Sequence, residues 1–317
     1  MQTKWAAGPG SGILPASLKT RIKTIRRYKT MYLLLFPALI YFVIFKYIPM
    51  AGIVIAFKNY NMVLGLWDSP WVGLSNFKDF INGVYFWDIM GNTIIISLYK
   101  LLIGFSAPIL LALLLNEVPK QWFKRIVQTI TYLPHFLSWV IVYGLMVSLL
   151  SPGDGLINML LKENGFNPIS FLTEPSWGRP VIIMSEVWKD IGWGAILYLA
   201  ALAGIDPSLY EAARMDGASK WRQLWHVTLP GIRGVIVLML ILKLSHILDA
   251  GFDQIFMFSN TFNQEKIDII DTWVYREGLE RLRIGLATAV GLFKAVIGFG
   301  LVLASNKLAK KFDGQIW

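Results

Sequence analysis

The chain has 317 residues, of which 55% are hydrophobic, and a formal net charge of +10. This composition excludes an ordinary soluble domain and is typical of a protein that crosses a membrane several times. Without cysteine there are no disulfides or thiolate metal sites, and the three histidines form no metal motif, so we expect no metal. The basic residues lie beside apolar segments rather than on one soluble face, so we expect no nucleic-acid partner.

The chain begins with a segment rich in lysine and arginine. We predict a basic cytoplasmic tail over residues 1–30 that includes a short surface helix. The apolar stretch that follows, 31–57, is too long for the core of a signal peptide and ends without a small-residue cleavage pattern, so it is predicted to stay as a membrane span. The membrane domain is predicted over residues 31–305 and a cytoplasmic C-terminal tail over 306–317.

Six apolar segments are each long enough to cross the hydrocarbon core, which takes about 20 helical residues. Lysine and arginine are densest in the tail, in two loops around Lys124 and Arg222, and at the C-terminal end. By the positive-inside rule these parts face the cytoplasm, so both termini are predicted inside an all-α protein with six spans. The predicted spans are residues 31–57, 87–115, 126–150, 180–203, 230–250 and 284–304.

A polar stretch, residues 206–230, separates the fourth and fifth spans. Asp206 is a good N-cap and Pro207 suits the first helical position, so a short helix is predicted from Pro207 to Met215. Gly217 permits a positive φ and ends that helix. The spacing therefore predicts a helical hairpin that lies outside the bilayer.

The second helix of this hairpin is predicted over residues 218–226, before Pro230 opens the fifth span. Ala212 and Ala213 leave one side of the first helix nearly flat, and charged neighbours are available for pairing, which favours a docking site for another protein. The alternative is an amphipathic loop that rests on lipid headgroups, with Trp221 and Trp225 as its anchors.

The spaced pattern Glu211-Ala212-Ala213, Gly217 and Leu229-Pro230 resembles the EAA loop of type I ABC-importer permeases. Its one departure is Val227, where the family has isoleucine. The phrase DSPWVGLSNF, residues 68–77, further resembles carbohydrate importers of the polysaccharide subgroup named after a lipoprotein-associated permease. The resemblance extends over almost the whole chain.

The resemblance implies the six-span type I permease fold and a non-catalytic permease subunit of the bacterial inner membrane. It implies uptake of oligo- or polysaccharide by alternating access, with a second homologous permease, two ATPase subunits and an external solute-binding protein as partners. The chain has no phosphate-binding loop motif, so we expect ATP and magnesium on the ATPase and no cofactor here. Another solute class stays open as the alternative. The implied ATPase-coupling residues are Glu211, Ala212, Ala213, Asp216, Gly217 and Pro230.

Ionisable residues at membrane depth are costly unless they face protein or water, so their positions mark the interior of the bundle. Aromatic rings beside them suit the C–H faces of sugars. The alternative is internal pairing between helices, such as Lys189 with Glu186. The candidate substrate path consists of Lys100, Trp139, Glu186, Trp188, Lys189, Asp190, Trp193, Lys243, His246 and Asp249.

The charges at membrane depth do not cancel in the sequence. Four lysines, with Lys294 as the fourth, stand against three acids, which leaves about one positive charge in a low-dielectric path and predicts tolerance of acidic sugars. A membrane transferase using Glu186, Asp190 or His246 is a rival hypothesis, as is a proton-coupled transporter. No catalytic motif supports the first, and the second gives no reason for an EAA loop.

Overall fold

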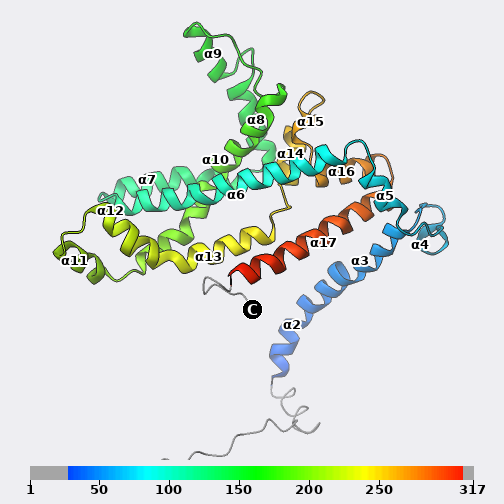
Figure 1. The fold of residues 1–317 in the computed structure, drawn as a ribbon, viewed down its shortest axis with the longest axis horizontal. Helices are drawn as coiled ribbons and strands as arrows, with labels where there is room; N and C mark the ends of the chain where they lie inside the picture. Colours follow the sequence, from blue (N-terminus) through cyan, green and yellow to red (C-terminus); the bar gives the residue numbers. More distant parts are fainter. Residues whose placement is uncertain (1–27, 310–317) are drawn as a thin grey trace, which may run out of the picture. The chain divides into compact units, whose positions relative to one another are not determined.

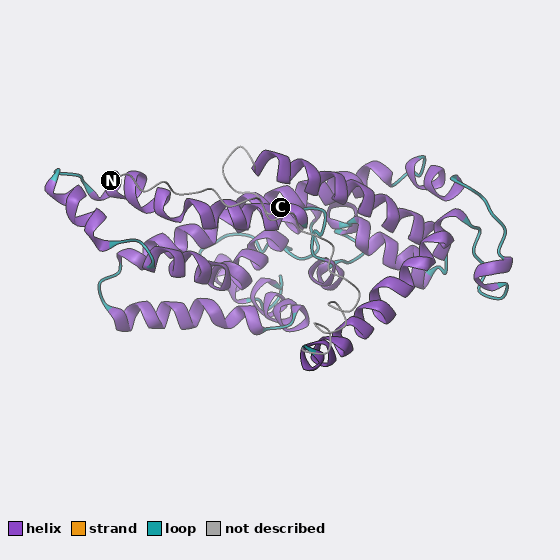
Figure 2. Ribbon diagram, turned by 90° about the horizontal axis from the view of Figure 1, so that it is seen from below, coloured by secondary structure: helices purple, strands orange, loops and turns teal. Residues whose placement is uncertain are grey.

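The computed structural model describes residues 28–309, and its regular elements within that range are all helical (Figure 2). The chain divides into two compact units, Met1–Val54 and Ile55–Trp317. Most of the predicted basic tail, 1–30, lies outside the described residues. The predicted C-terminal tail begins inside a helix, because α17 continues to Ala309.

The first unit consists of the opening part of one apolar helix. Its segments are α2 (Lys29–Phe42), the π-turn η1 (Val43–Tyr47), α3 (Ile48–Met50) and the 3₁₀ segment η2 (Ala51–Phe57), which leads into the second unit. Together they form a 29-residue apolar helix that is long enough to cross a membrane. The first predicted span therefore corresponds to a helix of sufficient length and apolar composition, which begins at Lys29.

Four long helices form the body of the second unit (Figure 1). α6 packs along α10, and α13 packs against α17. The predicted second span gains residues at both ends, and the fourth begins at Pro175 because Pro180 is accommodated inside the helix. The four helices are α6 (Phe86–Glu117), α10 (Pro175–Ala203), α13 (Leu229–Ser245) and α17 (Ile284–Ala309).

The third predicted span is a broken one. It consists of α7 (Gln121–Tyr132), the 3₁₀ turn η3 (Leu133–Phe136) and α8 (Trp139–Leu150), and the chain bends by 111° between its halves. Ser138 explains why α8 starts anew, because its hydroxyl accepts a hydrogen bond from the Ile141 N–H at 3.4 Å. Pro134 falls in the turn that precedes the break.

The fifth span differs from the prediction at both ends. α12 (Lys220–Gln223), the π-turn η4 (Leu224–Thr228) and α13 form one helix from Lys220 to Ser245, so the prediction of a separate helix over 218–226 was wrong. The wider turn at η4 admits the missing N–H of Pro230 without a break. The span also ends at Ser245 rather than at residue 250, before Gly251 adopts φ +93°.

Short helices occupy the loops that we predict to be external. In Figure 1, α11 (Pro207–Met215) lies at one end of the second unit, and α4 and α5 lie at the opposite end. The short helices are α4 (Gly65–Asp68), α5 (Ser75–Ile81), α9 (Leu156–Glu163), α14 (Phe252–Phe258), α15 (Gln264–Ile267), α16 (Ile270–Tyr275) and the π-turn η5 (Arg276–Glu280).

Four helices of the described chain are individually long and apolar enough to cross a membrane, and the number rises to six if each of two bent helix pairs is one span. One bent pair is α7 to α8, and the other is α10 with α11. The core between these helices is apolar. Ile96, Ile182 and Ile255 pack together near one end, and Ala112, Tyr198 and Ile232 near the other.

Candidate functional site

The first helix of the hairpin after the fourth span, α11, and the turn that follows it are built as their local sequence predicts. The carboxylate of Asp206 accepts a hydrogen bond from the Ser208 N–H at 2.9 Å, which caps α11 and lowers the pKa of Asp206 below its ordinary value. Gly217 has φ +73°, and the Ala218 N–H bonds back to the Ala213 carbonyl at 2.9 Å. The turn therefore requires a residue that tolerates the left-handed region.

The predicted coupling residues lie mainly on the surface of this hairpin. Glu211, Ala212, Asp216 and Gly217 are exposed, and Ala213 is partly buried. Apolar side chains surround them: Met215 is 88% exposed, and Trp221 and Trp225 are also exposed. Pro230 is set apart from this group as the second residue of α13.

Three contacts join the hairpin, or the residues that flank it, to the long helices. The Tyr210 hydroxyl lies 3.1 Å from the Thr228 hydroxyl, which connects α11 to the start of the fifth span. Lys220 Nζ donates to the Glu117 carboxylate at the end of α6 over 2.7 Å. Gly231 packs so closely on Ile205 that a Cβ there would lie 2.7 Å from the Ile205 side chain. These contacts connect the hairpin to α6 and to the helix of the fifth span.

Half of the predicted path residues meet at one cavity of about 310 Å³. They come from α6, α10, α13 and the irregular segment after Ser245, so residues from four segments are brought together. The charged and histidine side chains that line the cavity are Lys100, Glu186, Lys243, His246 and Asp249.

Lys100 occupies a buried position between three helices and is 8% exposed. Its ammonium donates to the Ala250 carbonyl at 2.7 Å and to Gln254 Oε1 at 2.5 Å, and it forms an ion pair with Glu186. These acceptors account for its three donors. Glu186 is thus paired with Lys100, not with Lys189 as the internal-pairing alternative supposed.

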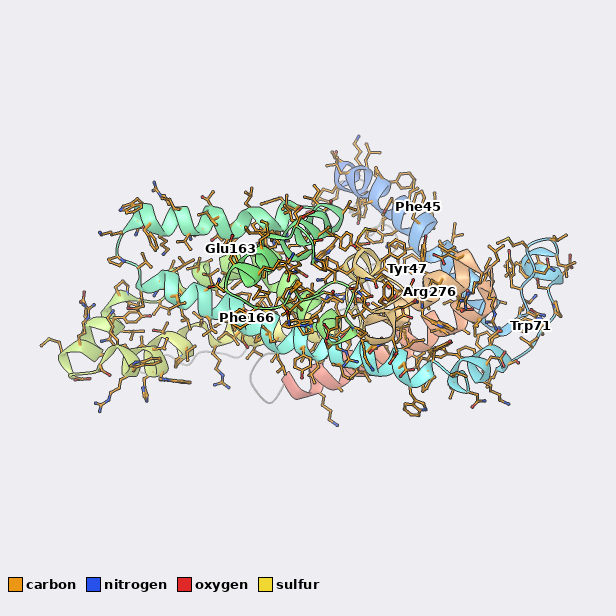
Figure 3. The ribbon with its side chains drawn as sticks, turned by 90° about the horizontal axis from the view of Figure 1, so that it is seen from above. Phe45, Tyr47, Trp71, Glu163, Phe166 and Arg276 are labelled. Atoms are coloured by element: carbon orange, nitrogen blue, oxygen red, sulfur yellow. The ribbon has the colours of Figure 1, made fainter. Side chains whose placement is uncertain are left out.

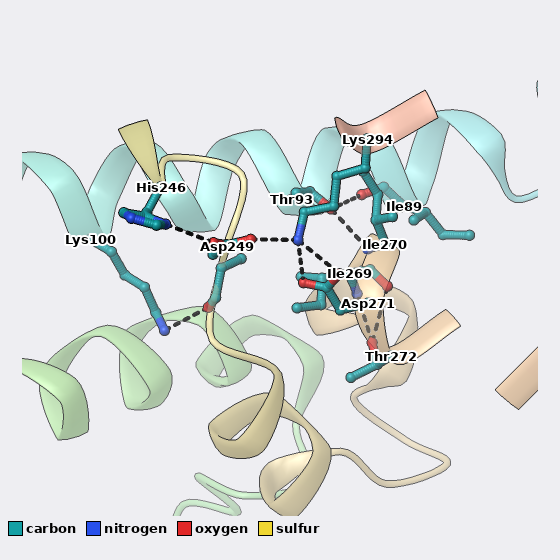
Figure 4. Close-up of polar contacts among 11 residues, drawn as sticks. Ile89, Thr93, Lys100, His246, Asp249, Ile269, Ile270, Asp271, Thr272 and Lys294 are labelled. Atoms are coloured by element: carbon teal, nitrogen blue, oxygen red, sulfur yellow. Dashed lines mark hydrogen bonds and ion pairs between the residues drawn. The ribbon is translucent and has the colours of Figure 1, made fainter. Parts of the chain in front are cut away.

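Lys294 has a similar position on the opposite side of the broken segment. Its Nζ lies 2.6 Å from Asp249 Oδ1 and 2.8 Å from both Asp271 oxygens (Figure 4). Asp271 was missed in the sequence, because it lies in a predicted external loop. It adds a fourth acid to the set, so the lysines and acids now balance in number.

Although the lysines and acids are equal in number, not every lysine has an acidic partner. Lys243 donates to the Gly104 carbonyl at 3.1 Å, and in the described part of the chain it has no acidic partner. Lys189 likewise donates to a backbone carbonyl, that of His135 at 2.7 Å, but Lys189 is buried. Lys243 is exposed and lines the cavity. It is therefore the lining lysine whose charge is available to a ligand.

A second group of predicted residues gathers around His135. The His135 ring stacks on Trp193 with centroids 4.4 Å apart, and its Nδ1 lies 2.8 Å from Asp190 Oδ1. Lys189 Nζ lies 5.5 Å from the centre of the Trp139 ring. Our sequence reasoning missed His135, although Pro134 beside it marks an interruption of the span.

Trp188 belongs to neither group. It lines an apolar pocket of about 340 Å³ with Met184, Trp177 and Phe171, between α10 and the α8–α9 region. No ionisable side chain lines this pocket. Trp188 is therefore a poor candidate for contact with a charged or polar substrate.

Comparisons with known proteins agree with this architecture. Residues 104–314 match the family described as "Binding-protein-dependent transport system inner membrane component". "Protein LplB" of Bacillus subtilis (strain 168) is 47% identical over 291 residues, covering 92% of each chain. The "Polygalacturonan/rhamnogalacturonan transport system permease protein YteP" of the same organism is 48% identical over 294 residues, covering 93% of this chain and 91% of the relative.

A solved structure has the same fold over nearly its whole length. It is a "bacterial ABC transporter involved in the import of the acidic polysaccharide alginate", with 41% identity, a TM-score of 0.87, and coverage of 92% of this chain and 99% of that one. Members of such families are transport subunits rather than enzymes. The chain belongs to the family of binding-protein-dependent transport system inner membrane components.

Proposed function

We propose that the chain is a permease subunit that imports acidic oligo- or polysaccharides. The observation that carries the proposal is the cavity of about 310 Å³ with Lys243 on its wall. The other charged side chains on its wall have ion-pair partners: Lys100 pairs with Glu186, and Asp249 pairs with Lys294, which lies outside the cavity lining. Lys243 has only a carbonyl partner, so its positive charge remains available to attract a carboxylate of the substrate.

The comparisons support the substrate class. One structural relative is a transporter for an acidic polysaccharide, and another was solved "in complex with alginate pentasaccharide-bound periplasmic protein". The relative YteP is named for polygalacturonan and rhamnogalacturonan. Trp193 stacks on His135, and His135 is held in turn by its hydrogen bond with Asp190. Trp193 therefore offers a fixed aromatic face of the kind that sugar rings contact.

The coupling site of this proposal is the hairpin at Glu211. The exposed Ala212 and Met215, together with the partly buried Ala213, form a surface for the ATPase subunit. The contacts of Tyr210 and Lys220 with the long helices carry the movement into the bundle. ATP and magnesium bind the ATPase.

The assembly comprises a second homologous permease, two ATPase subunits and an external solute-binding protein, placed in a bacterial inner membrane. Six spans with both termini in the cytoplasm fit the positive-inside rule and the position of the hairpin at one end of the unit. Alternating access then exposes the cavity at Lys243 first to the outside and later to the cytoplasm.

The test is ATPase activity of the complete transporter, copurified with its partner subunits and reconstituted with its solute-binding protein. Matched uronic-acid and neutral oligosaccharides are compared at equal concentrations. The proposal predicts stimulation by the acidic series. Stimulation by neutral sugars alone contradicts the acidic substrate class, and failure to copurify with an ATPase contradicts the coupling role.

A further inference from the structure

The loop between the first span and α5 has an unusual construction. We call residues 59–71 the Lys58 loop, after the lysine that precedes it. Lys58 is 3% exposed, and its ammonium donates to the carbonyls of Leu66 at 2.7 Å and Trp67 at 2.9 Å. It also lies 5.0 Å from the centre of the Trp71 ring. A buried charge is costly unless it is satisfied, and here backbone groups of the loop satisfy it.

Further bonds close the loop at its base. The Asn59 N–H donates to the Pro70 carbonyl at 2.9 Å, and the Asn61 N–H donates to the Ser69 hydroxyl at 3.0 Å. Ser69 in turn donates to the Gly65 carbonyl at 2.6 Å, and Gly65 has φ +71°. The loop is thus a preformed turn, not an extended connection.

This preformed turn presents apolar side chains to its surroundings. Val63 is 94% exposed and Trp67 is 85% exposed, and Met62, Leu64 and Trp71 are exposed with them. The only Asp, Glu, Lys, Arg or His within residues 59–71 is Asp68. Trp71 lies on this loop apart from Glu163 and Phe166 of the α9 region (Figure 3). Such an exposed cluster marks an interaction surface.

The position of the loop in the chain identifies what covers this surface. It starts two residues after Phe57, where the first membrane-crossing helix ends, so it cannot lie far from the end of that span. Tryptophan and tyrosine are enriched at membrane–water interfaces, and the loop holds Tyr60, Trp67 and Trp71. With one charge, the loop has little to offer an anionic surface but suits the boundary between headgroups and acyl chains.

We propose that the tip of the Lys58 loop, at Val63 and Trp67, inserts into the outer leaflet of the membrane that the first span crosses. Lys58 is its positioning residue, because it holds the backbone of Leu66 and Trp67 in the shape that exposes the tip. The anchor fixes the outer end of the first span at the interface. The choice of leaflet rests on the proposed orientation, whereas the lipid contact does not.

The absence of cysteine makes a direct test possible. The full chain with Val63→Cys carries a fluorophore at that position and is reconstituted in phosphatidylcholine vesicles. A matched control carries the fluorophore at Glu265→Cys on α15, whose side chain is 71% exposed. Nitroxide-labelled phosphatidylcholine and aqueous iodide serve as the two quenchers.

The proposal predicts strong quenching at residue 63 by the nitroxide lipid and weak quenching by iodide, with the reverse at residue 265. Replacing part of the phosphatidylcholine with anionic lipid leaves the result unchanged, because the tip is apolar. Iodide quenching at residue 63 as strong as at residue 265, without lipid quenching, overturns the proposal and points to a protein partner.

Further variants test the role of Lys58 and the orientation of the loop separately. Lys58→Met removes the bonds to Leu66 and Trp67 and should weaken lipid quenching at residue 63, while Lys78→Met on α5, an exposed lysine, should not. Equal quenching in both variants contradicts the role of Lys58. Labelling of Ser75→Cys, an exposed position on α5, by an impermeant thiol reagent only from the inside overturns the orientation and leaves the lipid contact standing.

Discussion

Lys294 Nζ lies 2.6 Å from Asp249 Oδ1, which joins the last helix to the segment where the fifth span breaks (Figure 4). The same ammonium binds Asp271 at the start of α16. Irregular backbone at membrane depth is tolerated only where protein or a water-filled cavity surrounds it. Lys294 on one side and Lys100 on the other supply those surroundings for the segment between His246 and Gly251.

Lys294→Met should lower the thermal unfolding midpoint of the detergent-solubilised chain. The substitution leaves Asp249 and Asp271 without their cation, and the expected loss is about 1–3 kcal/mol, reduced from the value for a fully buried pair because Asp249 is exposed. Lys307→Met near the end of the same helix is the control. Equal midpoints for the two variants would show that the Lys294 pairs contribute nothing to stability.

Glu211→Lys should abolish transport without preventing insertion into the membrane. The charge reversal changes an exposed position of the proposed ATPase surface and removes no internal bond that the structure shows. Gly217→Val should have the same effect, because φ +73° is strained for a β-branched residue. Uptake and membrane yield are measured together. Parental uptake by both variants would refute the docking role of the hairpin.

Cysteines at Ser75 and Asn164 should react with an impermeant thiol reagent added outside intact cells, and a cysteine at Ser219 should not. All three positions are exposed in the structure, so a failure to react reports the side of the membrane rather than burial. The parent chain contributes no background reaction, since it has no cysteine. External labelling of the Ser219 variant would reverse the proposed orientation.

The hairpin should respond to pH through Asp206. Its pKa is lowered by the hydrogen bond from Ser208, so the stabilisation is complete above the ordinary pKa of an aspartate and is lost as the pH falls through the lowered value. A spin label at Met215→Cys should therefore gain mobility only in acid. Asp206→Asn keeps a capping side chain without a titrating group and should remove this pH dependence. An acid transition that persists in Asp206→Asn would assign it to another group.

The sequence predicted the first helix and the turn of the hairpin well because their determinants are local. Asp206, Pro207 and Gly217 act within one or two turns, and each takes the conformation that its residue type favours. The continuation of α12 into α13 was not predictable in the same way. Pro230 predicts a helix boundary, and the helix continues through it because of the wider π-turn that precedes it.

The ion pairs of the cavity depend on contacts between residues far apart in the chain. Lys100 meets Ala250 and Gln254 across about half of the sequence, and no local pattern specifies such a pairing. The charge balance inferred from the spans omitted Asp271, because α16 looks like part of a loop. The sequence therefore named five of the side chains that line the cavity, but it did not show how they pair or which lysine lacks an acidic partner.

Because Lys100 is held by three internal bonds and Lys243 by only one, Lys243 is the better position at which to test selectivity for acidic substrates. Lys100→Met would disturb three internal bonds, so its effect on transport would report structure as well as substrate. Lys243 has a single carbonyl partner and faces the cavity. Its replacement therefore removes a charge from the path with little other change.

The most direct measurement of the central claim compares uptake of matched uronic-acid and neutral oligosaccharides by the reconstituted transporter, with Lys243, Lys243→Arg or Lys243→Met. Arginine keeps the positive charge and methionine removes it while filling similar space. We predict that Lys243→Met loses most of its uptake of the acidic substrate and keeps that of the neutral one, and that Lys243→Arg retains both. An unchanged ratio of acidic to neutral uptake in Lys243→Met would contradict a charge-selective path at this lysine.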